Sequence, residues 1–289
     1  MNHVSRPYIL DQINDVLYGD RRYAIVCADM LEVCDMLPAM SVDLTVTSPP
    51  YDAARTYGIG FKKTGWEFID WCLDRYQACY WKTRGATAWV MEGQTRKFEY
   101  SGSPMILFAE LHRRGLKMRK PPIYERHGIP GSGGNDWFKN RYEPIICAAH
   151  GKLPYSDNTA CGHPPKYGPG GPPSHRMVDG SRVNAKVQTR RKPDGVRLKD
   201  GLYVPPELAN PGNIISVGAG GGGALGSKYA HENEAPFPEK VPEFFIKSCC
   251  PPNGVVYDPF SGSGTTLKVA LANGRKCIAV DIRQSQCEL

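Results

Sequence analysis

The most informative stretch of the sequence is residues 255–266, Val-Val-Tyr-Asp-Pro-Phe-Ser-Gly-Ser-Gly-Thr-Thr. It predicts a buried strand that ends at Asp258, a glycine-rich turn, and a helix over residues 266–273. Glycines at the carboxyl end of a strand let the backbone approach a ligand closely. The P-loop has a similar turn but needs a lysine that is missing here, which argues against an NTPase. The alternative interpretation is an ordinary strand-turn-helix joint.

A second acidic residue follows the turn. Residues 276–280 predict a strand that ends at Asp281, and a carboxylate there could accept both hydroxyls of a ribose, as in dinucleotide-binding folds. Two acids at two strand ends weaken the interpretation as a simple joint. The glycine run at 218–223 also fits G-x-G-x-x-G, but no strand leads into it and no helical pattern follows, so it predicts a flexible loop.

Upstream of this motif, buried apolar runs alternate with amphipathic stretches. Strands are predicted over 23–28, 42–47, 86–91, 116–126 and 143–149, and helices over 31–37, 66–82, 104–114 and 237–248. Gly85 is expected to end the helix that begins at residue 66. Such alternation predicts an α/β fold with a mostly parallel sheet and helices on both faces.

The middle of the chain breaks the pattern. Residues 161–180 contain ten Gly or Pro, and residues 161–200 contain nine Lys or Arg against three Asp. The segment 151–210 is therefore either a solvated insertion or a region that contacts nucleic acid, and its charge alone favours neither. The expected division is 1–150, the insertion 151–210, and 211–289.

The second chemical motif is Thr-Ser-Pro-Pro-Tyr at 47–51, directly after the predicted strand 42–47. Two prolines stiffen the backbone and orient its carbonyl oxygens. A polar residue before them and an aromatic ring after them make a recess that suits an extruded nucleobase with an exocyclic amine. On its own, the motif also fits a proline-stiffened turn that has no function, which is a serious alternative.

Together the two motifs resemble the β group of S-adenosylmethionine-dependent DNA amino-methyltransferases. In that group a (D/N/S)-P-P-(Y/F) catalytic motif comes first and a D-P-F-x-G-S-G-T-T cofactor motif comes last, which is a circular permutation of the Rossmann-like methyltransferase fold. Residues 231–238, His-Glu-Asn-Glu-Ala-Pro-Phe-Pro, resemble the H-x-A-P-F-P segment of the family with two extra residues after His231. Residues 141–147 resemble the strand that precedes the target-recognition region.

The resemblance implies methyl transfer from S-adenosylmethionine to a flipped base in double-stranded DNA. It implies acceptor roles for the Ser48 side chain and the Pro49 carbonyl, and stacking of Tyr51 on the base. The catalytic residues would be Ser48, Pro49, Pro50 and Tyr51. The cofactor-binding residues would be Asp29, at the adenine, together with Phe237, Pro238, Asp258, Phe260, Ser261, Gly262, Ser263, Gly264, Thr265, Thr266 and Asp281. The DNA-binding residues would be Lys166, Arg176, Arg182, Lys186, Arg190, Arg191 and Lys192, in the place of the family's target-recognition region.

Base choice and partners follow from the same resemblance. A serine before Pro-Pro-Tyr is commoner among cytosine-N4 enzymes of the family and an aspartate among adenine-N6 enzymes, so Ser48 favours cytosine N4 over adenine N6. A methyltransferase for RNA or for protein glutamine is disfavoured by the permuted motif order. A DNA-binding protein with a decayed site is a further alternative. A homodimer and a cognate restriction endonuclease are both left open.

Composition bounds the remaining classes. The chain has 289 residues, 41% of them hydrophobic and 22% charged, which is globular, and its net charge of +7 favours an anionic partner. No apolar run reaches the length of a membrane span, and residues 1–6 have no signal-like apolar region, so a cytoplasmic enzyme is expected. The ten cysteines form no Cys-x-x-Cys pair, and we therefore expect free thiols and no metal site.

Overall fold

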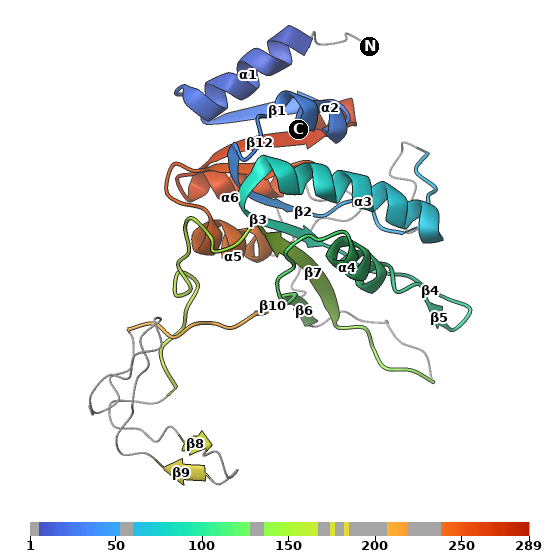
Figure 1. The fold of residues 1–289 in the computed structure, drawn as a ribbon, viewed down its shortest axis with the longest axis vertical. Helices are drawn as coiled ribbons and strands as arrows, with labels where there is room; N and C mark the ends of the chain where they lie inside the picture. The colour runs from blue at the N-terminus through green and yellow to red at the C-terminus, as the bar shows by residue number, and fades with distance from the viewer. Residues whose placement is uncertain are drawn as a thin grey trace. The chain divides into compact units, whose positions relative to one another are not determined.

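A computed structural model gives the fold of the chain (Figure 1). It describes residues 6–52, 60–127, 136–166, 174–176, 182–184, 207–218 and 238–288. The chain divides into two compact units, one formed by Met1–Asp157 with Asn213–Leu289 and the other by Asn158–Gly212. The second unit overlaps most of the predicted insertion 151–210.

The first unit is built on an eight-stranded sheet with the order β1-β12-β11-β2-β3-β7-β6-β10. Strand β7 is antiparallel to both of its neighbours, β3 and β6. All other neighbouring strands in this sheet pair in parallel. This confirms the predicted α/β fold with a mostly parallel sheet. The strands are β1 (Tyr23–Cys27), β2 (Val42–Thr47), β3 (Thr83–Val90), β6 (Ile123–His127), β7 (Tyr142–Ala149), β10 (Ile214–Gly218), β11 (Val255–Asp258) and β12 (Lys276–Asp281).

Helices cover both faces of this sheet (Figure 1). They are α1 (Arg6–Tyr18), α2 (Met30–Met36), α3 (Gly65–Lys82), α4 (Ser103–Arg113), α5 (Lys240–Cys249), α6 (Thr265–Ala272) and α7 (Gln284–Cys287). Buried side chains of α1 to α4 form one apolar cluster with the sheet, and those of α5 and α6 form another. Neighbouring residues on one strand belong to opposite clusters, as Tyr257 and Val256 do, because side chains alternate across a strand.

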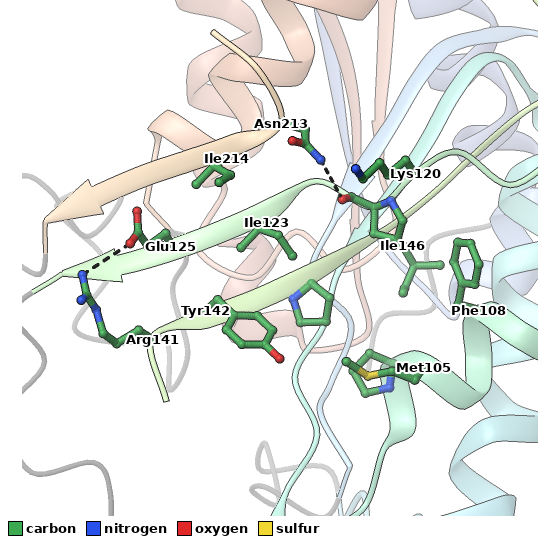
Figure 2. A pocket seen from close by; sticks show the side chains of 13 residues that line it. Met105, Phe108, Lys120, Ile123, Glu125, Arg141, Tyr142, Ile146, Asn213 and Ile214 are labelled. Carbon is green, nitrogen blue, oxygen red and sulfur yellow. Dashed lines mark hydrogen bonds and ion pairs between the residues drawn. The ribbon is translucent and has the colours of Figure 1, made fainter. Parts of the chain in front are cut away.

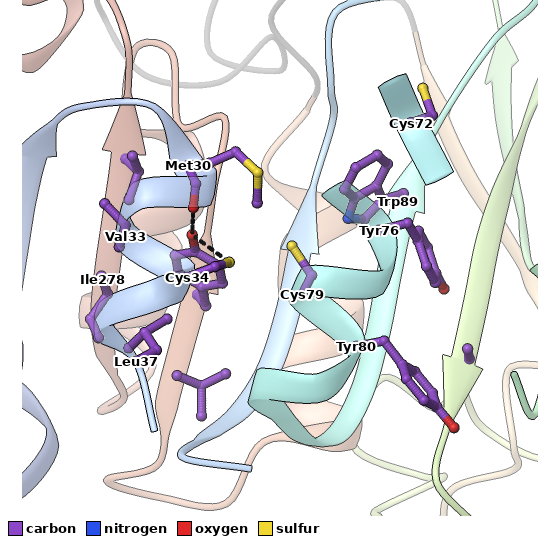
Figure 3. Packing of buried hydrophobic residues seen from close by; sticks show 14 of the residues in the cluster. Met30, Val33, Cys34, Leu37, Cys72, Tyr76, Cys79, Tyr80, Trp89 and Ile278 are labelled. Atoms are coloured by element: carbon purple, nitrogen blue, oxygen red, sulfur yellow. Dashed lines mark hydrogen bonds between the residues drawn. The ribbon is translucent and has the colours of Figure 1, made fainter. Parts of the chain in front are cut away.

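Figure 3 shows part of the first cluster, where α2 and α3 meet the sheet. The Tyr257 hydroxyl lies 3.5 Å from Cys34 Sγ and donates to the Met30 carbonyl at 3.4 Å, so the polar end of this buried ring has partners. All ten cysteines are free thiols, as predicted, and six of them are buried. In the described part of the chain, none of the helices is long and apolar enough to cross a membrane.

Two sequence predictions in this unit were wrong in detail. The helix ends at Lys82 and Gly85 lies inside β3, where a Cβ would come within 2.1 Å of the Asp43 carbonyl oxygen. Gly85 therefore permits close approach of β2 and does not stop a helix. The strand predicted over 116–126 is reduced to β6, because Pro121 and Pro122 cannot donate to a sheet.

Several elements had no sequence prediction. They are α1, α7, β10 and the two small antiparallel pairs, β4 (Thr95–Arg96) with β5 (Glu99–Tyr100), and β8 (Ser174–Arg176) with β9 (Arg182–Asn184). The pair β8–β9 belongs to the second unit, which also contains a bridge between His163 and Ala209. The role of this unit in DNA recognition stays a prediction.

Candidate active site

The Ser-Pro-Pro-Tyr motif follows a central, fully buried strand. Every residue of β2 is buried, and the chain leaves the sheet after Thr47. The Ser48 hydroxyl donates to the Tyr51 oxygen at 3.2 Å, and the Tyr51 hydroxyl donates to Glu143 Oε2 at 2.7 Å. The motif is therefore anchored through its last side chain to β7, where Glu143 is located.

Glu143 is a buried carboxylate with two kinds of partner. Its other oxygen, Oε1, lies 2.9 Å from the Arg126 guanidinium, and its side chain is 8% exposed. Burial raises the pKa of Glu143, while the charge of Arg126 and the hydroxyl of Tyr51 oppose that rise. Neither Glu143 nor Arg126 was predicted as a site residue. Glu143 lies in the stretch 141–147 that resembles a family strand, but nothing in that stretch or around Arg126 indicates a contact with Tyr51.

The two sequence motifs meet at neighbouring strand ends. Strands β2 and β11 pair in parallel, and Thr47 Oγ1 donates to Asp258 Oδ1 at 2.6 Å across 211 positions of sequence. The Phe260 amide donates to the same oxygen at 3.2 Å. Asp258 is 1% exposed, and this burial raises its pKa to about 6. The contact between Thr47 and Asp258 therefore places the start of the Ser-Pro-Pro-Tyr motif beside the start of the glycine turn, at the carboxyl ends of β2 and β11.

The glycine turn after β11 has a backbone conformation that leaves space next to Gly264. Gly262 and Gly264 have φ angles of +49° and +77°, which glycine adopts without strain. The Ser261 amide donates to the Val280 carbonyl at 2.8 Å, so the turn reaches the end of β12. A Cβ on Gly264 would meet no atom within 4 Å, and Gly264 directly precedes α6. The turn thus leaves space beside a helix N-terminus.

Asp281 closes the other side of this turn. Its Oδ2 accepts the Gly262 amide at 2.9 Å, and its Oδ1 accepts the Arg283 amide at 2.9 Å. The Arg283 guanidinium adds bonds of 3.1 Å and 3.3 Å to the two oxygens. These four bonds occupy the four lone-pair positions of a carboxylate. A ribose hydroxyl would therefore bind Asp281 only after the Arg283 side chain moves. Competition by Arg283 for this carboxylate was not predicted from the sequence.

Asp29 caps the helix α2 and belongs to a mixed polar and aromatic group. Its Oδ1 accepts the Leu31 amide at 2.8 Å, and its Oδ2 lies 3.1 Å from Arg75. Arg75 lies over the Trp71 ring at 4.4 Å, and that ring lies 5.7 Å from the ring of Phe260. Asp29 is therefore linked to Phe260, at the start of the glycine turn, through Arg75 and Trp71 of α3. The helical spacing of α3 identified Trp71 only as a core position and gave no signal for Arg75.

The remaining predicted site residues are only partly described. Pro238 is buried and accepts the Val241 amide at 3.0 Å at the start of α5, whereas Phe237 lies outside the described residues. Ser263, Thr265 and Thr266 are buried in the glycine turn and the first turn of α6. Among the predicted DNA contacts, Lys166 is exposed, and Arg176 and Arg182 are opposite each other in the β8–β9 pair. Lys186, Arg190, Arg191 and Lys192 lie outside the described residues.

A separate apolar groove lies at the β10 end of the sheet (Figure 2). Side chains of α4, β6, β7 and β10 line it, including Met105, Phe108, Ile123, Tyr142 and Ile214. Tyr142 and Glu143 are adjacent on β7 and therefore point to opposite faces of the sheet. The groove is thus distinct from the Tyr51–Glu143 contact. Across the described ranges there is no group of three or more side chains suited to holding a metal ion.

Comparison with known proteins gives the family. The family model described as DNA methylase matches residues 42–289. The orphan methyltransferase M.BamHII of Bacillus amyloliquefaciens is 31% identical over 256 residues, which are 86% of this chain and 87% of that protein. The DNA adenine methyltransferase YhdJ of Escherichia coli K12 is 25% identical over 94% of this chain and 82% of that protein. 

Among solved structures, the cytosine-N4-specific PvuII DNA methyltransferase has a similar fold, with a TM-score of 0.65 at 19% identity. The match covers 92% of this chain and 84% of that one. At that identity the similarity establishes the fold alone. The extent of the family model and of the M.BamHII alignment establishes more: the chain belongs to the DNA methylase family of amino-methyltransferases.

Proposed function

We propose that this chain transfers a methyl group from S-adenosylmethionine to the exocyclic amine of a flipped base in double-stranded DNA, with cytosine N4 as the favoured position. One observation carries the proposal. The Thr47–Asp258 hydrogen bond of 2.6 Å joins the ends of β2 and β11, so Ser48 and the glycine turn begin at adjacent points. Ligands of open α/β sheets bind at the carboxyl ends of such strands.

The residues at the glycine turn fit the proposed cofactor. The open space at Gly264 admits a ligand close to the backbone, and the Asp281 carboxylate offers acceptors for ribose hydroxyls once Arg283 moves. The aromatic group around Phe260 and Trp71 supplies apolar surface, and Asp29 supplies an acceptor for the adenine amine. When bound, the cofactor supplies an electrophilic methyl group on a sulfonium sulfur.

The Ser-Pro-Pro-Tyr motif would prepare the amine. The lone pair of a base amine is delocalised into the ring, and hydrogen bonds from its N–H groups to fixed acceptors favour localisation on nitrogen. We assign this to the Ser48 oxygen and the Pro49 carbonyl, with Tyr51 stacking on the base. No covalent enzyme intermediate is required, and holding the base in line with the donor methyl would account for much of the acceleration. The basic second unit, including Lys166, Arg176 and Arg182, would contact the phosphates.

Adenine N6 is the second candidate, favoured by the similarity to YhdJ, which is named an adenine methyltransferase. The serine at position 48 favours cytosine. The hydroxyl-for-carboxylate difference at one position does not fix base choice by itself, because the shape of the pocket also discriminates. A cytoplasmic location, a homodimer and a companion restriction endonuclease remain predictions attached to this proposal.

A labelled-methyl assay tests the proposed substrate class. The purified protein is incubated with methyl-tritiated S-adenosylmethionine and, separately, with unmethylated DNA, with RNA and with a protein mixture. We expect label in DNA alone, and none with the Ser48→Ala variant at the same protein concentration. Label in RNA or protein, or cofactor binding without transfer to several DNAs, would contradict the proposal. DNA binding without cofactor binding would identify the decayed-site alternative.

A further inference from the structure

A directed chain of hydrogen bonds leads from the half-buried Arg126 to the catalytic motif. Arg126 on β6 lies 2.9 Å from one oxygen of Glu143 on β7, and the other oxygen accepts the Tyr51 hydroxyl at 2.7 Å. The Tyr51 oxygen in turn accepts the hydroxyl of Ser48 at 3.2 Å. Three separate segments of the first unit therefore determine the orientation of one serine hydroxyl.

The chemistry of a carboxylate sets the direction of this chain. An ionised carboxylate only accepts hydrogen bonds, so the Tyr51 proton must point to Glu143. The phenol oxygen then presents lone pairs to Ser48, which donates its proton to Tyr51. A serine hydroxyl has one proton, and once that proton is committed, the remaining function of the oxygen is to accept.

The ionised state of Glu143 depends on its neighbours. Burial disfavours the charge, and the nearby carboxylate of Glu92 adds to this effect, while Arg126 and the Tyr51 hydroxyl favour the charge. Glu92 has its own partners, since it accepts from Tyr100 at 3.0 Å and from Asn140 at 3.2 Å. Arg126 is the cation that favours the ionised, accepting form of Glu143.

We propose that Glu143, paired with Arg126, is a positioning residue that fixes the Tyr51 hydroxyl and thereby makes the Ser48 oxygen a hydrogen-bond acceptor for the target amine. This inference rests on the proposed function. Glu143 does not touch the substrate; it acts through Tyr51. Both N–H hydrogens of the amine would then find acceptors, because the Pro49 carbonyl also accepts only.

The Glu143→Gln variant tests the direction of the chain. Glutamine keeps the size of the side chain but can donate to Tyr51 from its amide nitrogen. That donation lets the Tyr51 proton point to Ser48, so the serine becomes a donor toward the amine. We expect the single-turnover methylation rate to fall by about tenfold to a hundredfold, the range of a hydrogen bond to a charged group. The dissociation constant for S-adenosylmethionine should stay within about twofold, because the chain orients the amine and not the cofactor.

Two further variants complete the design. Tyr51→Phe removes the hydroxyl that joins Ser48 to Glu143 and leaves the Glu143–Arg126 pair intact. This variant therefore tests the chain of hydrogen bonds even if Glu143→Gln does not fold. Glu125→Gln is the matched control. This β6 carboxylate accepts from Ser216 at 2.5 Å and is not a member of the chain that joins Arg126, Glu143, Tyr51 and Ser48. The control should keep the wild-type rate.

Coupling between the two sites decides the outcome. If Glu143 acts through Tyr51, the double variant Tyr51→Phe/Glu143→Gln should be no slower than the slower single variant. A double variant whose rate loss is the product of both single losses would overturn the inference, as would either single variant within twofold of the wild-type rate. If the wild-type protein itself methylates no DNA, the proposed function fails instead.

Discussion

The Asp281 carboxylate offers the sharpest test of the proposed cofactor site, because its structural bonds and its proposed ligand bonds can be separated. Asp281→Asn replaces a buried carboxylate that accepts from the Gly262 amide and the Arg283 amide, both at 2.9 Å, and from the Arg283 guanidinium. The amide keeps one accepting oxygen and places a donor against the other bonds. A lost bond to a charged group costs about 1.5–3 kcal/mol, and we expect a destabilisation of that size.

The expected losses can be measured in two assays. In a domain of this size each kcal/mol lowers the melting temperature by roughly 2–4 °C, so Asp281→Asn should melt about 3–12 °C lower in the absence of cofactor. The lost bonds to the ribose should also weaken S-adenosylmethionine binding by about 10–150-fold, measured by isothermal titration calorimetry. Asp74→Asn, an exposed carboxylate of α3, is the matched surface control and should change neither value.

Arg283→Gln separates the two roles of Asp281. This variant also breaks the partly buried ion pair and should lower the melting temperature, but it frees carboxylate lone pairs for the ribose. Its affinity for S-adenosylmethionine should equal or exceed that of the wild type. If Asp281→Asn binds the cofactor as tightly as the wild type, or if both variants lose affinity equally, the assignment of Asp281 to the ribose is refuted.

Three other perturbations have defined outcomes. Burial raises the pKa of Asp258 to about 6, so the folded state binds this proton more tightly than the unfolded state does. The wild type should therefore lose stability as the pH rises from about 4 to 6. Asp258→Asn should flatten this pH dependence of the unfolding free energy. Urea unfolding at several pH values measures this, and an equally steep profile in the variant would reject the cause. Tyr51→Ala should lower turnover at least tenfold while leaving cofactor affinity within about twofold, since the ring is proposed to stack on the base; a larger loss in affinity than in turnover would place Tyr51 at the cofactor. Neutralising Arg190, Arg191 and Lys192 together should weaken DNA binding and reduce the slope of log affinity against log salt by about 3; an unchanged slope would return this segment to the interpretation as a solvated insertion.

The sequence predicted the central sheet well because its strands are short, buried and apolar. Strands β2, β11 and β12 were predicted to within one residue, and each ends at a residue that also carries a chemical pattern. The prediction of secondary structure failed where one residue type can serve two structural roles. Gly85 serves close packing of β2 and β3, although glycine also ends helices. The edge strand β10 follows an aperiodic segment, and its strand character depends on pairing with β6.

The candidate site shows the same limit. Motifs identified Ser48, Tyr51, Asp258 and Asp281, because their spacing within a strand-turn pattern is distinctive. Arg126 and Glu143 were not predicted, since each makes a contact that only the fold creates, and Arg283 was not predicted either. Arg283 could have been suspected, because it lies two residues after Asp281 and can reach the same carboxylate. Glu143 is 92 positions from its partner Tyr51, and no local pattern connects them.

Nucleoside mass spectrometry would identify the methylated base. Unmethylated DNA is incubated with the purified protein and S-adenosylmethionine carrying a deuterated methyl group, digested to nucleosides, and examined for new bases. We expect N4-methylcytosine carrying the deuterated methyl, and its absence with the Ser48→Ala variant. N6-methyladenine would contradict the assigned base while keeping amino-methyl transfer. Label at a ring carbon, or no labelled nucleoside although the protein binds both cofactor and DNA, would contradict the central claim.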